Sequence, residues 1–363
     1  MTSAAAVNNV RWEQGSYADL PSLVADRRNQ DGREDRLPGG VLTGSGRIAL
    51  TALLDFGRAE RGWRRIWIPS YYCPDVVEHL ARGPLNVRQY VCGPWGKEDT
   101  PELQPDDVLL RVAYFGWGPL PAASFAADVI EDHTHHPMGG WSSSASYAFA
   151  SLRKCLPIPD GGLVWSPRGL PLPRAPMPDP RHDGAVLKRL AAMAMKRAYL
   201  AGEAIDKGSV RALELAAEER FLEGHQAPIS AWSQLMLERL SIRVLNHARR
   251  CNHAVLRAAL RDCQAVTVLG PEEPEAPVAA ILRVSGDCSR DALRTHLTEE
   301  GIYTAVLWPM PHRENGAADD PRARDYSAST LAVHVDARYA ADDMQRVAER
   351  IMAGVDDARL HHG

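Results

Sequence analysis

The sequence contains no pair of cysteines at the Cys-x-x-Cys spacing of redox motifs and many zinc sites. Its six cysteines are scattered along a chain of 363 residues. In a chain of this length, that distribution predicts reduced thiols and argues against a disulfide framework.

Long apolar runs and an excess of positive charge are missing as well. No window approaches the run of about 18 apolar residues that indicates a transmembrane helix. The N-terminal residues do not combine a basic region with an apolar core, so we expect no secretory signal and a cytoplasmic protein. The net charge of −4 provides no electrostatic reason to expect nucleic acid or an anionic membrane as a partner.

The remaining composition is that of a globular protein, with 45% hydrophobic and 24% charged residues. The length predicts one large α/β domain and a smaller one. Apolar strands expected at 65–69, 108–113 and 127–132 alternate with helical segments, which favours a parallel sheet. Ligands of such sheets bind outside the carboxyl ends of the strands. We therefore expect a site among the strand-end loops, which are 70–73, 114–118, 132–136 and 151–161.

The middle of the chain is helical by its composition. Residues 185–222 predict one long helix and residues 230–261 a second, with structural and dimer-forming roles and with their basic residues on a solvated face. The expected buried positions in the second helix are Trp232, Leu235, Leu240 and Val244. From residue 265 the pattern returns to strands and helices. We expect an N-terminal segment at 1–40, a large domain at 41–255 and a small C-terminal domain at 256–363.

One stretch, residues 146–165, is the strongest candidate for a site. It predicts a strand, a turn that carries Lys154, and a Gly161-Gly162 step into another strand. Asp132 ends the apolar run before it, so an acid and an amine at two strand ends can converge on one ligand. Taken alone, Lys154 is more typical of a surface lysine, and Asp132 can be a helix cap or a turn residue.

Two further patterns are weaker. Gly44-Ser-Gly46 opens a predicted helix, whose backbone amides suit a phosphate, and Arg47 adds a charged donor. An ordinary glycine-rich helix entry explains the same pattern. A zinc site is another interpretation of the histidines His133, His135 and His136. Their spacing matches no standard ligand pattern, so we expect no metal.

Taken in order, these residues carry a resemblance to a known family. The chain resembles the DegT/DnrJ family, the sugar-aminotransferase-like group of fold-type I enzymes that depend on pyridoxal 5′-phosphate. The resemblance covers roughly residues 40–355. The matching elements are Ser45-Gly-Arg-Ile-Ala-Leu50, Pro69-Ser-Tyr-Tyr72, Tyr114-Phe-Gly116, Ile130-Glu-Asp-His-Thr-His135, Lys154 with Gly161-Gly162, and Gly301-Ile302 followed by Pro309-Met-Pro-His312.

The resemblance implies an α/β fold with a large, mostly parallel sheet flanked by helices and a small C-terminal α+β domain. It also implies roles for single residues. Lys154 forms an imine with the cofactor and moves protons at the substrate. Asp132 keeps the pyridine nitrogen protonated, and His135 lies near the ring hydroxyl or the ring face. The ring is stacked by Tyr72, with Tyr71 and Cys73 as alternatives, and the phosphate is held by amides of Gly46 and Arg47 and by a hydroxyl near the lysine.

The sequence departs from the family in three places. Phe149 stands where many members have a serine, so Ser151 is the nearest substitute for the phosphate hydroxyl. The link from Gly118 to Val129 is too short for a helical crossover, which predicts a lost helix. Near residues 224–226 there is no match to the Gly-x-Asn-x-Arg stretch of the family, which weakens the carry-over of nucleotide-sugar specificity.

The function implied is that of a homodimeric, biosynthetic aminotransferase. It would move an amino group from an amino acid, with glutamate as the expected donor, to a keto or aldehyde carbon of a sugar-like or natural-product substrate. Elimination, decarboxylation or retro-aldol chemistry with the same cofactor is the alternative, and a catalytically silent scaffold is a third possibility. By position, His312, Arg324 and the 225–228 loop are candidates for substrate contacts.

Overall fold

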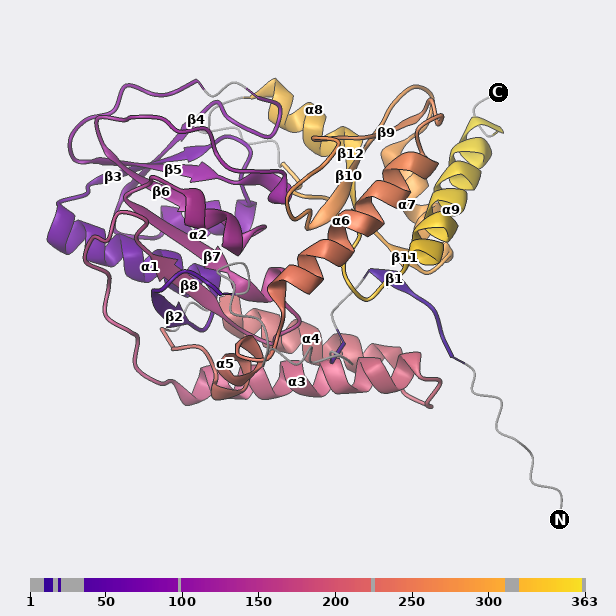
Figure 1. The fold of residues 1–363 in the computed structure, drawn as a ribbon, viewed down its shortest axis with the longest axis horizontal. Coiled ribbons are helices and arrows are strands. Elements are labelled where there is room, and N and C mark those ends of the chain that lie inside the picture. Colours follow the sequence, from indigo (N-terminus) through magenta and orange to yellow (C-terminus); the bar gives the residue numbers. More distant parts are fainter. Residues whose placement is uncertain are drawn as a thin grey trace, which may run out of the picture.

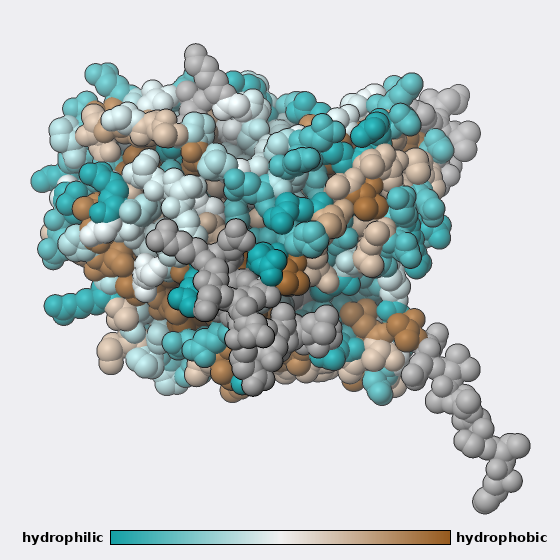
Figure 2. Space-filling view, in the orientation of Figure 1, coloured by the Kyte–Doolittle hydropathy of each residue, from teal (hydrophilic) through white to brown (hydrophobic). Residues whose placement is uncertain are grey.

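The computed structural model describes residues 10–15, 19–20, 36–96, 99–222, 226–310 and 320–360. A large sheet with its helices lies on one side of the molecule and a smaller sheet with its own helices on the other (Figure 1). None of the helices in these ranges has the length and apolarity needed to cross a membrane. Hydrophilic residues cover much of the face in Figure 2, with smaller hydrophobic patches between them.

The large sheet has seven strands in the order β2-β8-β7-β6-β5-β3-β4. All neighbours from β4 to β7 are parallel, whereas β8 is antiparallel to both β7 and β2. This arrangement confirms the predicted mostly parallel sheet. The strands are β2 Val41–Thr43, β3 Arg65–Pro69, β4 Asn86–Tyr90, β5 Asp107–Val112, β6 Asp128–Asp132, β7 Tyr147–Ser151 and β8 Gly162–Trp165.

The apolar runs become strands because both faces of this sheet are covered. All six residues of β5 are buried, which explains their unbroken hydrophobic pattern. Helix α1 (Gly46–Phe56) packs on β7 and β8 with its buried side, and α2 (Pro74–Ala81) follows β3. The chain between β5 and β6 is irregular apart from a 3₁₀ turn at Tyr114–Gly116. The predicted loss of a crossover helix is therefore confirmed.

The prediction of two long central helices is wrong. The first consists of α3 (Pro180–Leu200) and α4 (Lys207–Leu222), which pack side by side after a turn at Gly202, whose φ is +98° (Figure 1). A positive φ favours glycine and ends the helix there. The second consists of α5 (Ala231–Leu237) and α6 (Ile242–Ala259), and the side chain of Ser241 caps α6 by accepting a hydrogen bond from the amide of Val244.

These breaks change which side chains are buried. Leu240 is buried as predicted and Trp232 is half-buried, but Leu235 and Val244 are each 44% exposed, against expectation. Most basic residues of these helices are exposed, as predicted, but Lys196 and Arg249 are buried. Lys196 pairs with Glu13, a residue of the N-terminal segment.

The small unit is built on a three-stranded antiparallel sheet in the order β12-β10-β9. Its elements are β9 Val266–Val268, β10 Ala279–Val284, α7 Arg290–Glu299, β11 Ile302–Tyr303, α8 Pro321–Ser329, β12 Thr330–His334 and α9 Ala341–Leu360. β1 (Gln14–Gly15) joins this unit by pairing in parallel with β11. Helix α6 runs along the small unit and contacts α9, so the boundary expected between residues 255 and 256 falls inside a helix.

Candidate active site

Lys154 lies on a short 3₁₀ turn, Leu152–Lys154, directly after β7. The turn is held from both sides: Leu152 is fully buried, and its amide donates to the carbonyl of Gly161 at 2.9 Å. Gly161 has a φ of +131°, and a Cβ on Gly162 would lie 2.2 Å from the carbonyl oxygen of Ser45. Only glycines fit this close approach of three chain segments. The turn therefore has a fixed backbone, while the Lys154 side chain is exposed to the adjoining cavities.

Asp132 ends β6, the strand next to β7, and its carboxylate is buried. One oxygen accepts a hydrogen bond from the Tyr72 hydroxyl at 2.7 Å, and the other accepts from the amide of Thr134 at 2.8 Å. Burial, and then the negative charge of Asp132, raise the pKa of Tyr72 well above its ordinary value. Tyr72 thus remains a donor and fixes the orientation of the carboxylate.

His135 lies one turn further along the same strand-end loop. Its ring stacks against both Phe115 and Trp308, at centroid distances of 5.5 and 5.8 Å. Burial first, and the nearby charge of Lys154 second, lower the pKa of His135 to about 3. Nδ1 accepts a hydrogen bond from the amide of Phe115 at 3.0 Å, so the neutral ring carries its proton on Nε2.

The N-terminus of α1 closes the site opposite Asp132. Ser45 caps the helix by accepting from the amide of Ile48 at 3.2 Å. A Cβ on Gly46 would lie 2.6 Å from the Cβ of Ser151, so glycine lets the helix start approach the end of β7. The partial positive charge of this helix end and the nearby Arg47 favour an anion. The Nε of Arg47 is buried and has no hydrogen-bond partner among the described residues.

Two cavities meet at Lys154. The smaller, about 100 Å³, is enclosed by the start of α1 and the ends of β6 and β7. The larger, about 740 Å³, extends from Lys154 towards the small unit. Four residues line both cavities, namely His135, Arg153, Lys154 and Trp308.

The smaller cavity collects the residues that the sequence predicted for the cofactor. They are Gly46, Arg47, Tyr72, Asp132, His135, Ser151 and Lys154. The candidate substrate residues are not part of this group: Arg324 lies on α8 and lines neither cavity, and His312 is outside the described residues. Of the other histidines, His133 lies 2.9 Å from Glu131 and His136 lies 3.4 Å from Glu275.

Sequence reasoning missed the charged residues that α3 and α4 bring to Lys154. Arg153 pairs with Glu218 at 2.6 Å, and Arg189 pairs with Glu214 and lies 3.7 Å from Glu218. Burial opposes ionisation of Glu218, but Arg153 and Arg189 outweigh it and lower its pKa. The sequence contains one local indication of this network, the position of Arg153 next to Lys154. Glu218 could not be linked to the site, because it belongs to a segment that was predicted to have a structural role.

Glu214, the deepest acid of this network, makes the stability of the fold dependent on pH. Burial raises its pKa from 4.5 to about 7, with Glu218 adding to the shift. A carboxyl with a raised native pKa stabilises the fold below its unfolded pKa, and this contribution is lost as the pH rises through the native pKa. We expect Glu214→Gln to remove a loss of up to about 3 kcal/mol between about pH 4.5 and pH 7.

Urea unfolding of the wild type and of Glu214→Gln across this pH range measures the effect. The two free energies of unfolding should diverge as the pH rises, to the advantage of the variant. Curves that stay parallel would show that the Glu214 carboxyl is already ionised at low pH in the folded protein.

Comparisons with known proteins agree with this geometry. The model of the DegT/DnrJ/EryC1/StrS aminotransferase family matches residues 229–352. No curated protein matches the sequence. Among solved structures, the chain is similar to the putative sugar aminotransferase Spr1654 of Streptococcus pneumoniae in its PLP form, with 11% identity, a TM-score of 0.59, and coverage of 95% of this chain and 99% of that one.

Two further structures are similar. DesI, crystallised with its TDP-sugar product, has 18% identity and a TM-score of 0.56, and the match covers 90% of this chain and 83% of that one. The aminotransferase TlmJ of Streptoalloteichus hindustanus has 16% identity and a TM-score of 0.56, with 87% and 86% covered. These likenesses show the fold. The family match over residues 229–352 adds support for the predicted resemblance to the DegT/DnrJ/EryC1/StrS aminotransferase family, whose enzymes use pyridoxal 5′-phosphate.

Proposed function

We propose that this protein is an aminotransferase that moves an amino group from glutamate to a keto or aldehyde carbon of a sugar-like or natural-product acceptor. The observation that carries the proposal is the convergence of Lys154 and Asp132 on one cavity at adjacent strand ends. We further propose that it acts as a cytoplasmic homodimer, as the family resemblance implies.

The residues around the smaller cavity fit pyridoxal 5′-phosphate. The start of α1 and the hydroxyl of Ser151 suit the phosphate, because a helix N-terminus and a hydroxyl both donate to an anion. Because residue 46 is a glycine, it has no side chain that could separate the backbone at the start of α1 from Ser151. Asp132 suits the ring nitrogen, and the Nε2 proton of neutral His135 suits the ring hydroxyl.

Each protein group then has a task that its position supports. The cofactor, when bound, supplies a carbonyl that takes up the amino group and a ring that accepts electrons. Lys154 lies where the two cavities meet, so its amine can hold the cofactor and move a proton to and from a substrate in the larger cavity. Asp132, oriented by Tyr72 and Thr134, holds a proton on the ring nitrogen.

The proposed class of acceptor rests on the descriptions of similar structures. DesI was crystallised with a TDP-sugar product, and Spr1654 is described as a putative sugar aminotransferase. These descriptions favour a sugar-like acceptor for a protein of this fold. The sequence lacks the Gly-x-Asn-x-Arg stretch, which weakens the case for a nucleotide sugar. A natural product without a nucleotide is therefore the other acceptor included in the proposal.

Glutamate added to the cofactor-loaded protein tests the reaction type. We expect the visible absorbance of the bound cofactor to disappear while one equivalent of 2-oxoglutarate forms, because the amino group stays on the cofactor when no acceptor is present. Measuring the absorbance and the 2-oxoglutarate in the same sample separates this reaction from others. Release of ammonia or carbon dioxide instead would assign elimination or decarboxylation, and an unchanged spectrum would contradict glutamate as the donor.

A further inference from the structure

The larger cavity has a mostly apolar wall. One side is formed by the loop after Lys154, a second by the N-terminal half of α6, and a third by the small unit. The apolar side chains on these three sides include Leu156, Pro157, Ile158, Val244, Leu245, Ala248, Leu307 and Ala332. Val244 is aliphatic and yet 44% exposed, and its side chain lines the cavity. An aliphatic wall of this kind binds apolar surface and gives a polar ligand few partners.

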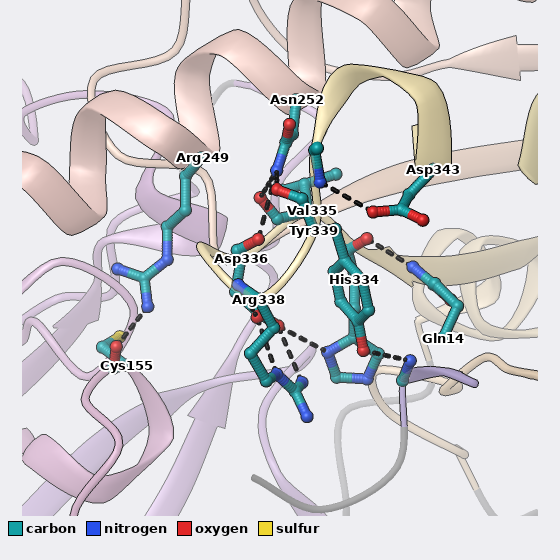
Figure 3. Close-up of polar contacts among 12 residues, drawn as sticks. Gln14, Cys155, Arg249, Asn252, His334, Val335, Asp336, Arg338, Tyr339 and Asp343 are labelled. Carbon is teal, nitrogen blue, oxygen red and sulfur yellow. Dashed lines mark hydrogen bonds and ion pairs between the residues drawn. The ribbon is translucent and has the colours of Figure 1, made fainter. Parts of the chain in front are cut away.

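The wall also carries polar and charged side chains, among them Ser241, His334 and Arg249. Arg249 is only 6% exposed, and its guanidinium donates to the carbonyl of Cys155 (Figure 3). It also donates, at 3.0 Å, to the side chain of Asn246. Its Nε is buried and has no hydrogen-bond partner among the described residues. The charge of Arg249 helps to lower the pKa of Asp336, but Arg249 makes no ion pair of its own within the described residues. A buried cation without a directly paired anion is costly, and an anionic ligand would offset that cost.

The other arginines of the cavity are already paired. Arg153 and Arg189 face Glu218 and Glu214, and Arg338 holds both oxygens of Asp336, at 2.7 and 2.8 Å (Figure 3). The carboxylate of Asp336 is thus already paired with Arg338. Of the four arginines that line the cavity, Arg249 alone makes no ion pair within the described parts of the chain.

We propose that the larger cavity binds an acceptor that is an organic anion with an apolar body. Its acidic group, a carboxylate or an equivalent, contacts Arg249, and its apolar body lies against Val244 and the loop after Lys154. This inference rests on the proposed function, because it assumes that the carbonyl of the acceptor reaches Lys154. A nucleoside diphosphate sugar fits less well, since its charges and hydroxyls would lie against aliphatic side chains and against arginines whose charges are already matched.

Two fluorescent probes separate the two parts of such a ligand. Anilinonaphthalene sulfonate has an apolar ring system and one anionic group, and phenylnaphthylamine has the ring system without the charge. Both are titrated into the cofactor-loaded protein, and the increase in fluorescence gives the dissociation constant. We expect both probes to bind at one site, and excess UDP-glucose to displace neither.

Variants then assign the site. Val244→Asp should weaken both probes about tenfold, because it places a charge on the apolar wall. Asp at this position is compatible with the first turn of α6, so the helix is kept. Leu235→Asp is the matched control: Leu235 is equally exposed on the neighbouring helix α5 but does not line the cavity, and this variant should bind as the wild type does.

Arg249→Met tests the anionic end, and Arg249→Lys tests whether charge alone suffices. Arg249→Met should weaken the sulfonate probe about tenfold and leave the neutral probe unchanged, with partial recovery in Arg249→Lys. Equal losses for both probes in Arg249→Met, equal binding in Val244→Asp and Leu235→Asp, or displacement by UDP-glucose would each overturn the inference. The visible absorbance of the cofactor and its response to glutamate are recorded in the same samples, so a failure of the proposed function is seen separately.

Discussion

Replacing Lys154 with alanine is expected to abolish the absorbance band of the imine between the cofactor and the protein, and to lower kcat by about 10³-fold or more. The absorbance depends on the covalent link between the cofactor and an amine, and the Lys154 side chain reaches the cofactor cavity from the turn after β7. In the proposed function the same amine carries out the proton transfer, so one change would remove both roles. Absorbance spectra and single-turnover assays with glutamate measure the two losses.

The fold should survive this change, because the backbone of the turn is held by the buried side chain of Leu152 and by the bond from its amide to Gly161. Lys188→Ala is a suitable control, since Lys188 is an exposed lysine on α3 that lines neither cavity. A Lys154→Ala protein that keeps the visible absorbance and turns over glutamate at the wild-type rate would move the catalytic role to another residue.

Asp132→Asn should lower kcat by about 10² to 10³-fold, the usual effect of removing a preorganised electrostatic partner. Asparagine is close to aspartate in shape and can accept from the amide of Thr134 as Asp132 does at 2.8 Å. It cannot hold a proton on the ring nitrogen, so the ring becomes a weaker electron acceptor. We therefore expect the cofactor to bind but the half-reaction with glutamate to slow, which stopped-flow absorbance records.

Tyr72→Phe separates charge from orientation. It removes the hydroxyl that donates to Asp132 at 2.7 Å and leaves the carboxylate in place. We expect a loss of about tenfold, consistent with one hydrogen bond to a charged group. If Tyr72→Phe slowed the half-reaction as much as Asp132→Asn does, Asp132 would matter through its orientation by Tyr72, and its charge would not be the main contribution.

Local sequence signals predicted much of the large sheet. Strand β3 lies at 65–69 as predicted, and the Gly44-Ser-Gly46 pattern marks the start of α1. The helix breaks at Gly202 and Ser241 were not predicted, because both residues occur in stretches whose composition favours helix throughout. Packing decides such breaks: α3 and α4 lie side by side, which a single continuous helix cannot do.

The cofactor cavity was more predictable than the substrate cavity for a physical reason. In a parallel sheet, residues at the carboxyl ends of adjacent strands meet whatever the length of the intervening chain, so Asp132 and Lys154 could be brought together from their order alone. Arg249 and Cys155 are 94 residues apart on elements with no such rule. Their contact, and the cavity beside it, depend on how α6 packs against the large unit.

The bond from Arg249 to the carbonyl of Cys155 joins helix α6 to the residue that follows Lys154, the proposed catalytic residue. A ligand that draws the Arg249 guanidinium towards itself changes the restraint on the Lys154 turn. Thermodynamic linkage makes that effect reciprocal. If Lys154 forms the covalent link to the cofactor and the larger cavity binds the proposed anion, forming or releasing that link would change the affinity of the cavity for the anion by the same factor.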